Sequence, residues 1–519
     1  MSSFEDKDTL ESRIQILRQR EERARAMGGK EKIARRDAKG LLNARSRIDV
    51  FLDPGTFVET GLLAVSSVVP EDRETTPADG KVAGFGKVGG RMVGVVSNDF
   101  TVKGASSSLT NMKKIGHVKR VATERGFPLV FFGESSGARM PDNMGSRGMG
   151  TLLGNDPQQY VRHRESPWAS AILGQCFGSS AWYACLSDFT VMRKGAILAV
   201  ASPPLASLAI GQKVEPEDLG GWKLHSEITG LVDKVVETDE EAMREIRRFL
   251  SYMPSNSNEA PPRAEVPAGS DEAADRIARI LPDSRKRGYD VHKIIDCLAD
   301  KDSFFEFKPR FGRTAVTGLA RLDGRVVGFV ANNPMAKAGA LDVAGCEKVT
   351  RFLVMCDSFN IPLILLVDTP GFVIGIEGEK QKAPGKIINF MTALQMCTVP
   401  KLSVIMRKSY GQAYLNMGGG RNSDDVVVWP TAEVSFMDAH FATEIVTWGK
   451  DASEEEKQKI RDQMQKESSA YDLAEIYAAQ AVIAPQETRR YLAQQLEIHE
   501  MRLSGGKGRH CMAAWPTTY

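Results

Sequence analysis

Apolar and polar positions alternate along the chain in a way that predicts one layout twice. Short β-branched runs, typical of buried strands, are separated by segments of helical length. The predicted strand, helix and strand occupy residues 92–96, 109–124 and 128–132 and, in the second half, 326–330, 343–359 and 362–367. Strands that alternate with helices at this spacing indicate crossover connections, so we predict an α/β fold.

The two halves also match residue by residue. Residues 90–94 (GRMVG) reappear as residues 324–328 (GRVVG), and the same offset places 127–130 (FPLV) on 361–364 (IPLI). These matches predict two tandem domains related by internal duplication. A duplicated domain can bind two related ligands, one in each copy, and so bring two substrates together.

The chain length agrees with two domains. A single hydrophobic core stops growing near 250–300 residues, and the chain has 519. Residues 254–270 are polar and rich in proline, which is typical of a linker. We therefore predict an N-terminal domain over residues 1–262 and a C-terminal domain over residues 263–519.

Charge and composition exclude several classes of protein. Lys and Arg total 68 and Asp and Glu total 66, so a net charge of +2 gives no reason to expect a nucleic-acid or membrane partner. The seven cysteines form no C-x-x-C pair and the seven histidines no ligand spacing, so we predict no metal site. The acidic N-terminus and the lack of a long apolar run predict a soluble, cytoplasmic protein.

Turns of small residues follow the predicted strands at matching positions. Residues 103–108 (KGASSS) and 337–340 (KAGA) form one pair, which ordinary turn chemistry explains as well as ligand binding does. Residues 174–183 and 410–414 form a second pair, in which a strand runs into the start of a helix. Backbone N–H groups at a helix N-terminus can stabilise an oxyanion, here an enolate.

No convincing general base accompanies these turns. Glu134 and Asp368 end predicted strands, and we expect them to cap the turns that follow rather than to act as bases. His225 and His440 have no partner in the sequence pattern, and we expect both to be structural. Two oxyanion sites without a base suggest that one substrate deprotonates the other.

Further motifs occur in a fixed order along residues 10–503. They are residues 44–48 (ARSRI), 52–57 (LDPGTF), 99–102 (DFTV), 136–139 (SGAR), 219–221 (LGG), 368–372 (DTPGF), 407–414 (RKSYGQAY) and 429–433 (WPTAE). Together they resemble the carboxyltransferase β subunit of biotin-dependent acyl-CoA carboxylases, of the propionyl-CoA, acetyl-CoA and 3-methylcrotonyl-CoA carboxylase type.

The resemblance implies an enzyme of the ligase or transferase class with two crotonase-like domains. Acyl-CoA would bind the N-terminal domain, and carboxybiotin the C-terminal domain of a neighbouring subunit in a homohexameric core. The biotin anion left after CO2 release would take the α proton of the acyl-CoA, and the enolate would attack the CO2. The implied oxyanion donors are Gly178 and Ser179 on the acyl-CoA side and Gln412 and Ala413 on the biotin side.

The resemblance also implies residues that line the two pockets. These are Ser136, Gly137, Ala138 and Arg139 for acyl-CoA, and Gly411, Tyr414 and Leu415 for biotin. Serine, glutamine and leucine at positions 179, 412 and 415 depart from the family pattern, which leaves the acyl group open. Phe177 and Trp182 replace small residues, and either fill the acyl pocket or offer it aromatic surface.

The chain contains no Met-Lys-Met biotin-attachment motif and no ATP-grasp segment. It would therefore work with a biotin carboxylase and biotin carboxyl carrier α subunit, in an α6β6 complex. Three other functions stay open: a biotin-dependent acyl-CoA decarboxylase subunit, a hydratase or isomerase that uses Glu134 or Asp368 as its base, and a non-catalytic subunit of a mixed carboxylase.

Overall fold

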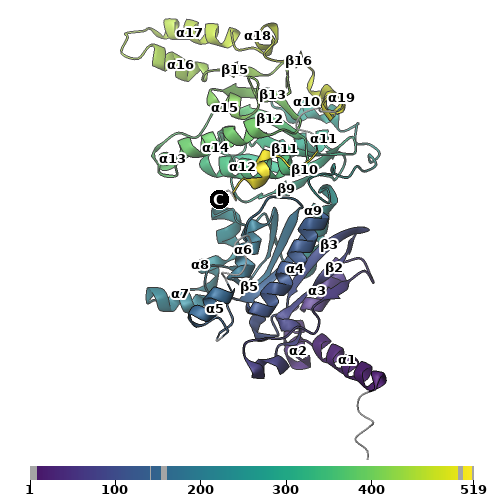
Figure 1. The fold of residues 1–519 in the computed structure, drawn as a ribbon. Coiled ribbons are helices and arrows are strands. Elements are labelled where there is room, and N and C mark those ends of the chain that lie inside the picture. The colour runs from purple at the N-terminus through teal and green to yellow at the C-terminus, as the bar shows by residue number, and fades with distance from the viewer. Residues whose placement is uncertain (1–8, 141, 153–159, 501–506, 517–519) are drawn as a thin grey trace, which may run out of the picture. The chain divides into compact units, whose positions relative to one another are not determined.

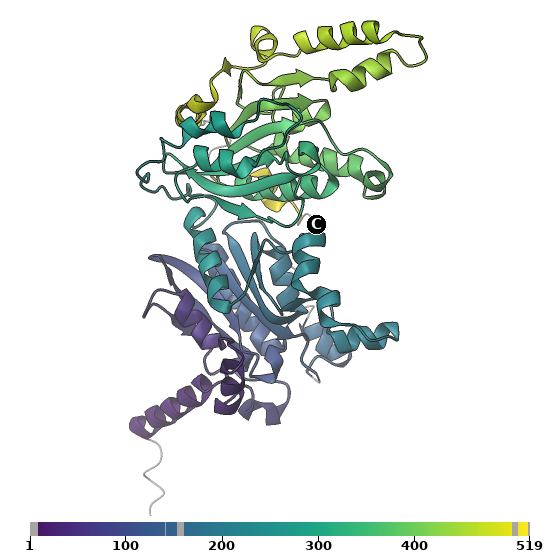
Figure 2. The ribbon, with the colours of Figure 1, turned by 180° about the vertical axis from the view of Figure 1, so that it is seen from behind.

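The computed structural model describes residues 9–140, 142–152, 160–500 and 507–516. The chain forms two compact units, Met1–Ser251 and Tyr252–Tyr519. Each unit contains one 8-stranded sheet covered by helices (Figures 1 and 2). Residues 254–270, the predicted linker, contain no helix or strand.

The sheet of the N-terminal unit has the order β1-β2-β3-β4-β5-β6-β8, and β7 pairs with β5. Strands β1 to β3 are antiparallel, and the strands from β3 onward are parallel. The strands are β1 (Val58–Thr60), β2 (Lys81–Val88), β3 (Arg91–Asn98), β4 (Leu129–Ser136), β5 (Trp168–Phe177), β6 (Phe189–Arg193), β7 (Ile197–Leu198) and β8 (Lys234–Val236). The helices are α1 (Leu10–Arg25), α2 (Lys30–Asp37), α3 (Ala44–Phe51), α4 (Leu109–Arg125), α5 (Gly145–Leu152), α6 (Ser179–Leu186), α7 (Pro203–Ile210), α8 (Pro216–Gly220) and α9 (Asp239–Tyr252).

The sheet of the C-terminal unit has the order β9-β10-β11-β12-β13-β14-β16, and β15 pairs with β13. Its strands are β9 (Phe305–Phe307), β10 (Ala315–Leu322), β11 (Arg325–Asn332), β12 (Leu363–Thr369), β13 (Lys401–Tyr410), β14 (Asp425–Val428), β15 (Glu433–Ser435) and β16 (Ala481–Val482). Its helices are α10 (Ile277–Ile280), α11 (Val291–Leu298), α12 (Val343–Ser358), α13 (Ile376–Lys380), α14 (Ala383–Met396), α15 (Gln412–Asn416), α16 (Ala439–Val446), α17 (Glu454–Lys466), α18 (Ala470–Glu475) and α19 (Thr488–Glu500).

The two sheets have the same topology, strand for strand. The short strand that leaves the main path pairs with β5 in one unit and with its counterpart β13 in the other. The strands and helices predicted from the hydrophobic pattern are confirmed as β3, α4 and β4 in the first half and as β11, α12 and β12 in the second. The α/β fold is therefore confirmed, with mainly parallel sheets.

Each unit needs a glycine where a long helix crosses the sheet. A Cβ atom at Gly94 in β3 would lie 3.2 Å from Val118 Cγ1 of α4. At the matching position in β11, a Cβ at Gly328 would lie 2.8 Å from Cys356 Sγ of α12. The internal sequence match at these two glycines therefore reflects a shared close approach of helix to sheet.

The N-terminal segment, residues 10–37, is rich in charged residues and helical, but two glycines divide it into α1 and α2. Gly29 precedes α2 with φ of 96°, which only glycine adopts at little cost. A Cβ atom at Gly28 would lie 2.3 Å from the backbone oxygen of Thr101. Gly28 N–H also donates to Thr101 Oγ1 at 3.0 Å, so the break lies against the chain just before residues 103–108.

Within the described ranges, no helix has the length and apolar character that a membrane span requires. The cytoplasmic location stays a prediction.

Candidate active site in each unit

In the N-terminal unit, β5 runs through one glycine into α6. Gly178 has φ of 62° and ψ of −131°, a conformation that favours glycine. The N–H groups of Ser179 and Ser180 open the helix and, like the N–H group of the predicted donor Gly178, form no hydrogen bond with any described residue. Two free donors at the start of a helix are the groups that an oxyanion site requires.

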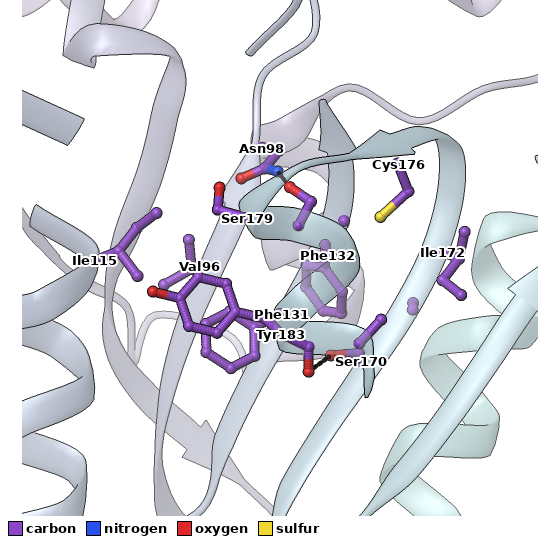
Figure 3. A pocket seen from close by; sticks show the side chains of 14 residues that line it. Val96, Asn98, Ile115, Phe131, Phe132, Ser170, Ile172, Cys176, Ser179 and Tyr183 are labelled. Carbon is purple, nitrogen blue, oxygen red and sulfur yellow. Dashed lines mark hydrogen bonds between the residues drawn. The ribbon is translucent and has the colours of Figure 1, made fainter. Parts of the chain in front are cut away.

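Side chains of the neighbouring segments hold the first turn of α6 in place. Ser179 Oγ lies 2.8 Å from Ser107 Oγ, and Asn98 Nδ2 donates to Ser180 Oγ at 2.8 Å. A small cavity with room for about one water molecule lies beneath the turn, beside the ring of Tyr183, which stacks on Phe131 (Figure 3). The two serine side chains therefore face the interior of the unit, and their N–H groups stay at the end of the helix.

The predicted acyl-CoA loop, residues 136–139, lies against this turn. A Cβ atom at Gly178 would be 3.4 Å from Gly137 Cα. Ser107 N–H donates to the Gly137 oxygen at 2.8 Å, and Arg139 N–H donates to the Ser107 oxygen at 2.8 Å. The structure therefore brings Gly137 and Ala138 beside Gly178 and Ser179.

Arg139 has a different role from its neighbours in that loop. Its guanidinium is buried, forms an ion pair with Asp79, and donates from Nε to Ser106 Oγ at 3.1 Å. Ser136 and Ala138 are exposed. Arg139 therefore shapes the loop from behind, and the exposed residues are the ones that a ligand can reach.

A left-handed turn precedes each loop and was not predicted. Lys103, Gly104 and Ala105 have φ values of 48°, 60° and 48°. Their counterparts at residues 337–339 have φ values of 48°, 55° and 87°. Non-glycine residues in this region cost about 1–2 kcal/mol each. The sequence signalled small residues here, but not that three consecutive residues are left-handed.

In the C-terminal unit, β13 runs through Gly411 into α15 in the same way. Gly411 has φ of 58° and ψ of −143°, and its N–H donates to the Ser435 oxygen at 3.0 Å. The N–H groups of Gln412 and Ala413 form no hydrogen bond with any described residue. The predicted donors of the second site are therefore unpaired, as at Ser179.

Side chains around the second turn contact α15 itself and the segment that follows it. Gln412 Nε2 donates to Asn416 Oδ1 at 3.2 Å, so this side chain lies along its own helix. A Cβ atom at Gly419 would collide with the ring of Tyr414, and one at Gly420 would lie 2.9 Å from Leu415 Cδ2. Tyr414 and Leu415 therefore pack on the glycine-rich segment after the helix.

The expectation that Glu134 caps the following turn is wrong. Its carboxylate is buried and accepts from Arg36 Nη1 and Nη2 at 2.9 and 2.8 Å, and it forms an ion pair with Arg47 at 2.9 Å. Burial raises the pKa of Glu134, but Arg47 and Arg36 outweigh burial and hold this pKa below its usual value. A carboxylate held ionised by two guanidiniums is a poor general base.

Asp368 corresponds to Glu134 and is paired in a different way. Its Oδ2 atom accepts from Arg407 Nε at 2.8 Å, and its backbone N–H donates to Asn332 Oδ1 at 3.1 Å. The capping expectation is therefore wrong for Asp368 as well. Both carboxylates hold the ends of their strands in place beside the glycine turns.

Of the two histidines expected to be structural, His440 is exposed and His225 has two partners for its ring. Its Nδ1 lies 3.0 Å from Thr229 Oγ1, and its Nε2 lies 2.7 Å from the Leu198 oxygen. These two contacts fit the expected structural role, which stays a prediction. No group of three or more metal-ligating side chains occurs in the part of the chain that the structure describes.

Comparison with known proteins identifies the family. A family profile described as the carboxyl transferase domain matches residues 35–505. The chain belongs to the carboxyl transferase domain family. The resemblance read from the ordered motifs is therefore confirmed.

Relatives of this carboxyl transferase cover nearly the whole chain. The carboxyltransferase subunit of propionyl-CoA carboxylase from Haloferax mediterranei is 35% identical over 94% of this chain and 96% of its own length. The methylmalonyl-CoA decarboxylase subunit alpha from Veillonella parvula is 30% identical over 93% of this chain and 94% of its own length. A crystal structure of transcarboxylase 12S, a hexamer with methylmalonyl-CoA bound, is similar with a TM-score of 0.87 and 31% identity, over 97% of this chain and 99% of that one.

Proposed function

We propose that this chain is the carboxyltransferase subunit of a biotin-dependent acyl-CoA carboxylase. It would move a carboxyl group from carboxybiotin to the α carbon of an acyl-CoA. The observation that carries the proposal is the turn repeated in both units, in which a left-handed glycine opens a helix with two unpaired N–H groups. Named relatives of the carboxylase and transcarboxylase type support it.

The duplication supports the assignment of one substrate to each copy. We infer two tandem crotonase-like domains, with acyl-CoA at Gly178 and Ser179 and carboxybiotin at Gln412 and Ala413. The donor sets fit these ligands, because a thioester oxygen and a ureido oxygen both accept hydrogen bonds from backbone N–H groups. The exposed residues Ser136 and Ala138 would line the acyl-CoA side.

The chemistry then needs no base from this chain. When bound, carboxybiotin would supply the carboxyl group and, once CO2 has left, the base for the α proton. Ser179 N–H stabilises the thioester oxygen as negative charge develops on it, and Gln412 and Ala413 N–H orient the ureido oxygen. Electrostatic stabilisation by preorganised donors of this kind is a large term in catalysis, about 3 kcal/mol for each donor removed.

The proposal includes partners and assembly. A separate α subunit would carry biotin and carboxylate it, which is supported by the description of the Haloferax mediterranei relative as one subunit of a carboxylase. The related transcarboxylase structure is described as a hexamer, which supports a homohexameric core within an α6β6 complex. The acyl group stays open. Phe177 is buried, whereas Trp182 is 39% exposed and offers aromatic surface.

The test deletes one donor in each unit. Ser179→Pro and Gln412→Pro remove an N–H at the first helical position, where the ring of proline fits without breaking the helix. Each should lower the rate of labelled-carbonate incorporation into an acyl-CoA panel by about 100-fold to 1,000-fold. The assay uses this chain assembled with its biotin-carrying partner.

Matched variants separate the N–H group from the side chain. Ser179→Ala and Gln412→Ala keep the N–H groups, so each should lose far less activity than its proline counterpart, although Ser179→Ala also removes the contact with Ser107 Oγ. Wild-type turnover in both folded proline variants would refute the oxyanion assignment.

A second candidate is the reverse direction, decarboxylation, which the similarity to the Veillonella parvula decarboxylase subunit favours. The same assembly would then release CO2 from a carboxylated acyl-CoA and would not fix carbonate.

A further inference from the structure

The internal duplication isolates one unusual residue, Lys81. Strands β2 and β10 begin at equivalent positions, with Lys81 in one and Ala315 in the other. In both units a helix lysine donates to the backbone oxygen of that residue, from Lys114 to Lys81 and from Lys348 to Ala315. The helix lysine is therefore part of the shared fold. The side chain of Lys81 is an addition, because the second copy forms the same sheet with alanine.

Lys81 is buried, with 1% of its surface exposed. Its Nζ donates to the Ala105 oxygen at 2.7 Å, the one hydrogen bond that this amine makes with the described residues. Ser135 Oγ also donates to the Ala105 oxygen, at 3.1 Å, and accepts from Gly137 N–H at 3.2 Å. Lys81 and Ser135 thus hold the left-handed turn against the loop that contains Gly137.

The residue that Lys81 holds is a strained one. Ala105 has φ of 48°, and its counterpart in the second unit is Gly339, which reaches φ of 87° with little strain. A strained alanine persists only where its surroundings fix it. Two residues beyond Ala105, Ser107 Oγ contacts Ser179 Oγ at 2.8 Å. A shift of the turn would therefore move the first residue of α6.

The charges around Lys81 come from several elements. Arg139 and Lys114 are like charges, Asp79 is the opposing charge, and the Cys176 thiol lies on β5. Burial, followed by the field of Arg139, lowers the pKa of Lys81 to about 7. The amine therefore changes charge near neutral pH. The ammonium form donates a stronger hydrogen bond to the Ala105 oxygen than the neutral amine does.

We propose that Lys81 is a positioning residue of the acyl-CoA site. It holds Ala105, and through Ala105 also Ser107 and Ser179, in the geometry that binds acyl-CoA. When Lys81 loses its proton, that binding becomes weaker. This inference rests on the proposed function. Lys81 acts through the turn and does not touch the substrate.

The experiment measures acyl-CoA affinity across pH. Titration calorimetry with propionyl-CoA is run on the full chain between pH 6 and pH 8.5. For the wild type, Kd should rise as pH passes through about 7. In Lys81→Met, which keeps the length and loses the donor, Kd should be about fivefold higher at pH 6, the factor for one lost hydrogen bond. It should no longer rise with pH through that range.

Ser135→Ala is the matched control. It removes the other donor to the Ala105 oxygen and keeps the amine, so Kd should increase while its dependence on pH remains. In the assembled enzyme, Lys81→Met should raise KM for acyl-CoA more than it lowers kcat. An unchanged Kd, or a pH dependence that survives in Lys81→Met, would overturn the proposal.

Amide hydrogen exchange separates this proposal from the proposed function. If the wild type neither binds nor turns over any acyl-CoA, the proposed function fails, and with it the substrate that we assign to Lys81. Exchange at residues 103–108 then still reports whether Lys81 holds the turn. Faster exchange in Lys81→Met would support that part, and unchanged exchange would overturn it.

Discussion

Arg47 carries its charge at a position where none of its side chain is exposed. It lies between Glu134 and Asp239, at 2.9 and 3.0 Å, and a second arginine pairs with each of these carboxylates. Without Arg47, Glu134 keeps Arg36 and Asp239 keeps Arg193, but two buried contacts between opposite charges are lost. Arg47→Met should therefore lower the free energy of unfolding by about 1.5–3 kcal/mol, measured by urea unfolding followed by circular dichroism.

The control for Arg47 is Arg35, whose side chain is 73% exposed and pairs with Glu31 on the surface. Arg35→Met should change the free energy of unfolding by less than about 0.5 kcal/mol. Equal effects of the two substitutions would mean that burial does not determine how much these ion pairs contribute to the free energy of unfolding.

Lys81 gives the N-terminal unit a stability that rises with pH. Its pKa is about 7 in the folded chain and 10.5 for an unperturbed lysine, so between these values the unfolded chain binds more protons. The free-energy cost of burying the charged amine is complete below pH 7 and disappears as pH approaches 10.5. This cost amounts to about 1.4 kcal/mol for each unit by which the pKa is lowered. The free energy of unfolding of Lys81→Met should therefore be higher than that of the wild type, and the difference should be largest at pH 6.5.

Urea unfolding of the two proteins at pH 6.5, 8 and 9.5 checks this sign. The difference between them should shrink steadily as pH rises. A difference that is constant with pH would show that Lys81 is charged, or neutral, in both states throughout.

Residue pairing is where the sequence was least informative. Glu134 and Asp368 were recognised as strand ends, but Arg36 lies 98 residues from Glu134 and Arg407 lies 39 residues from Asp368. Local patterns carry no information on such distant partners. The oxyanion turns were predictable because a strand, a glycine and a helix start are contiguous in the chain.

At the scale of elements, two glycines set how closely helices approach the sheets. Gly94→Ala should destabilise by about 1–3 kcal/mol, since the added methyl group would press on α4, and Gly328→Ala should act likewise through α12. Gly116→Ala is the control, because it lies within α4 with open space around it and should be neutral or stabilising by up to about 1 kcal/mol. Thermal unfolding of the three variants tests this order.

The hydrophobic pattern was sufficient for most regular elements and insufficient for their irregular links. Long apolar strands and helices repeat in both halves, so β3, α4 and β4 could be predicted together with their counterparts. The break at Gly29 and the left-handed turn at residues 103–105 depend on contacts with other segments, such as Thr101 and Ser135. Single-residue propensities do not predict such tertiary constraints.

At the scale of the whole molecule, the proposed hexamer requires surfaces that subunits cover. In the C-terminal unit, Phe436, Phe441 and Trp448 are 80%, 67% and 84% exposed, around α16. Large exposed aromatic side chains of this kind are typical of protein interfaces. Trp448→Asp should reduce the assembly to smaller species in light scattering coupled to size-exclusion chromatography. Trp448→Phe, which retains the apolar surface, should leave it intact.

The network around Arg47 also constrains how the chain can fold during translation. Its partner Asp239 follows 192 residues later, at the start of α9 and close to the end of the first unit. During translation, Arg47 is therefore synthesised long before Asp239. Until α9 has emerged from the exit tunnel, Arg47 can pair with Glu134 but not with Asp239. The first unit therefore cannot complete its buried ion network before its final helix has been synthesised.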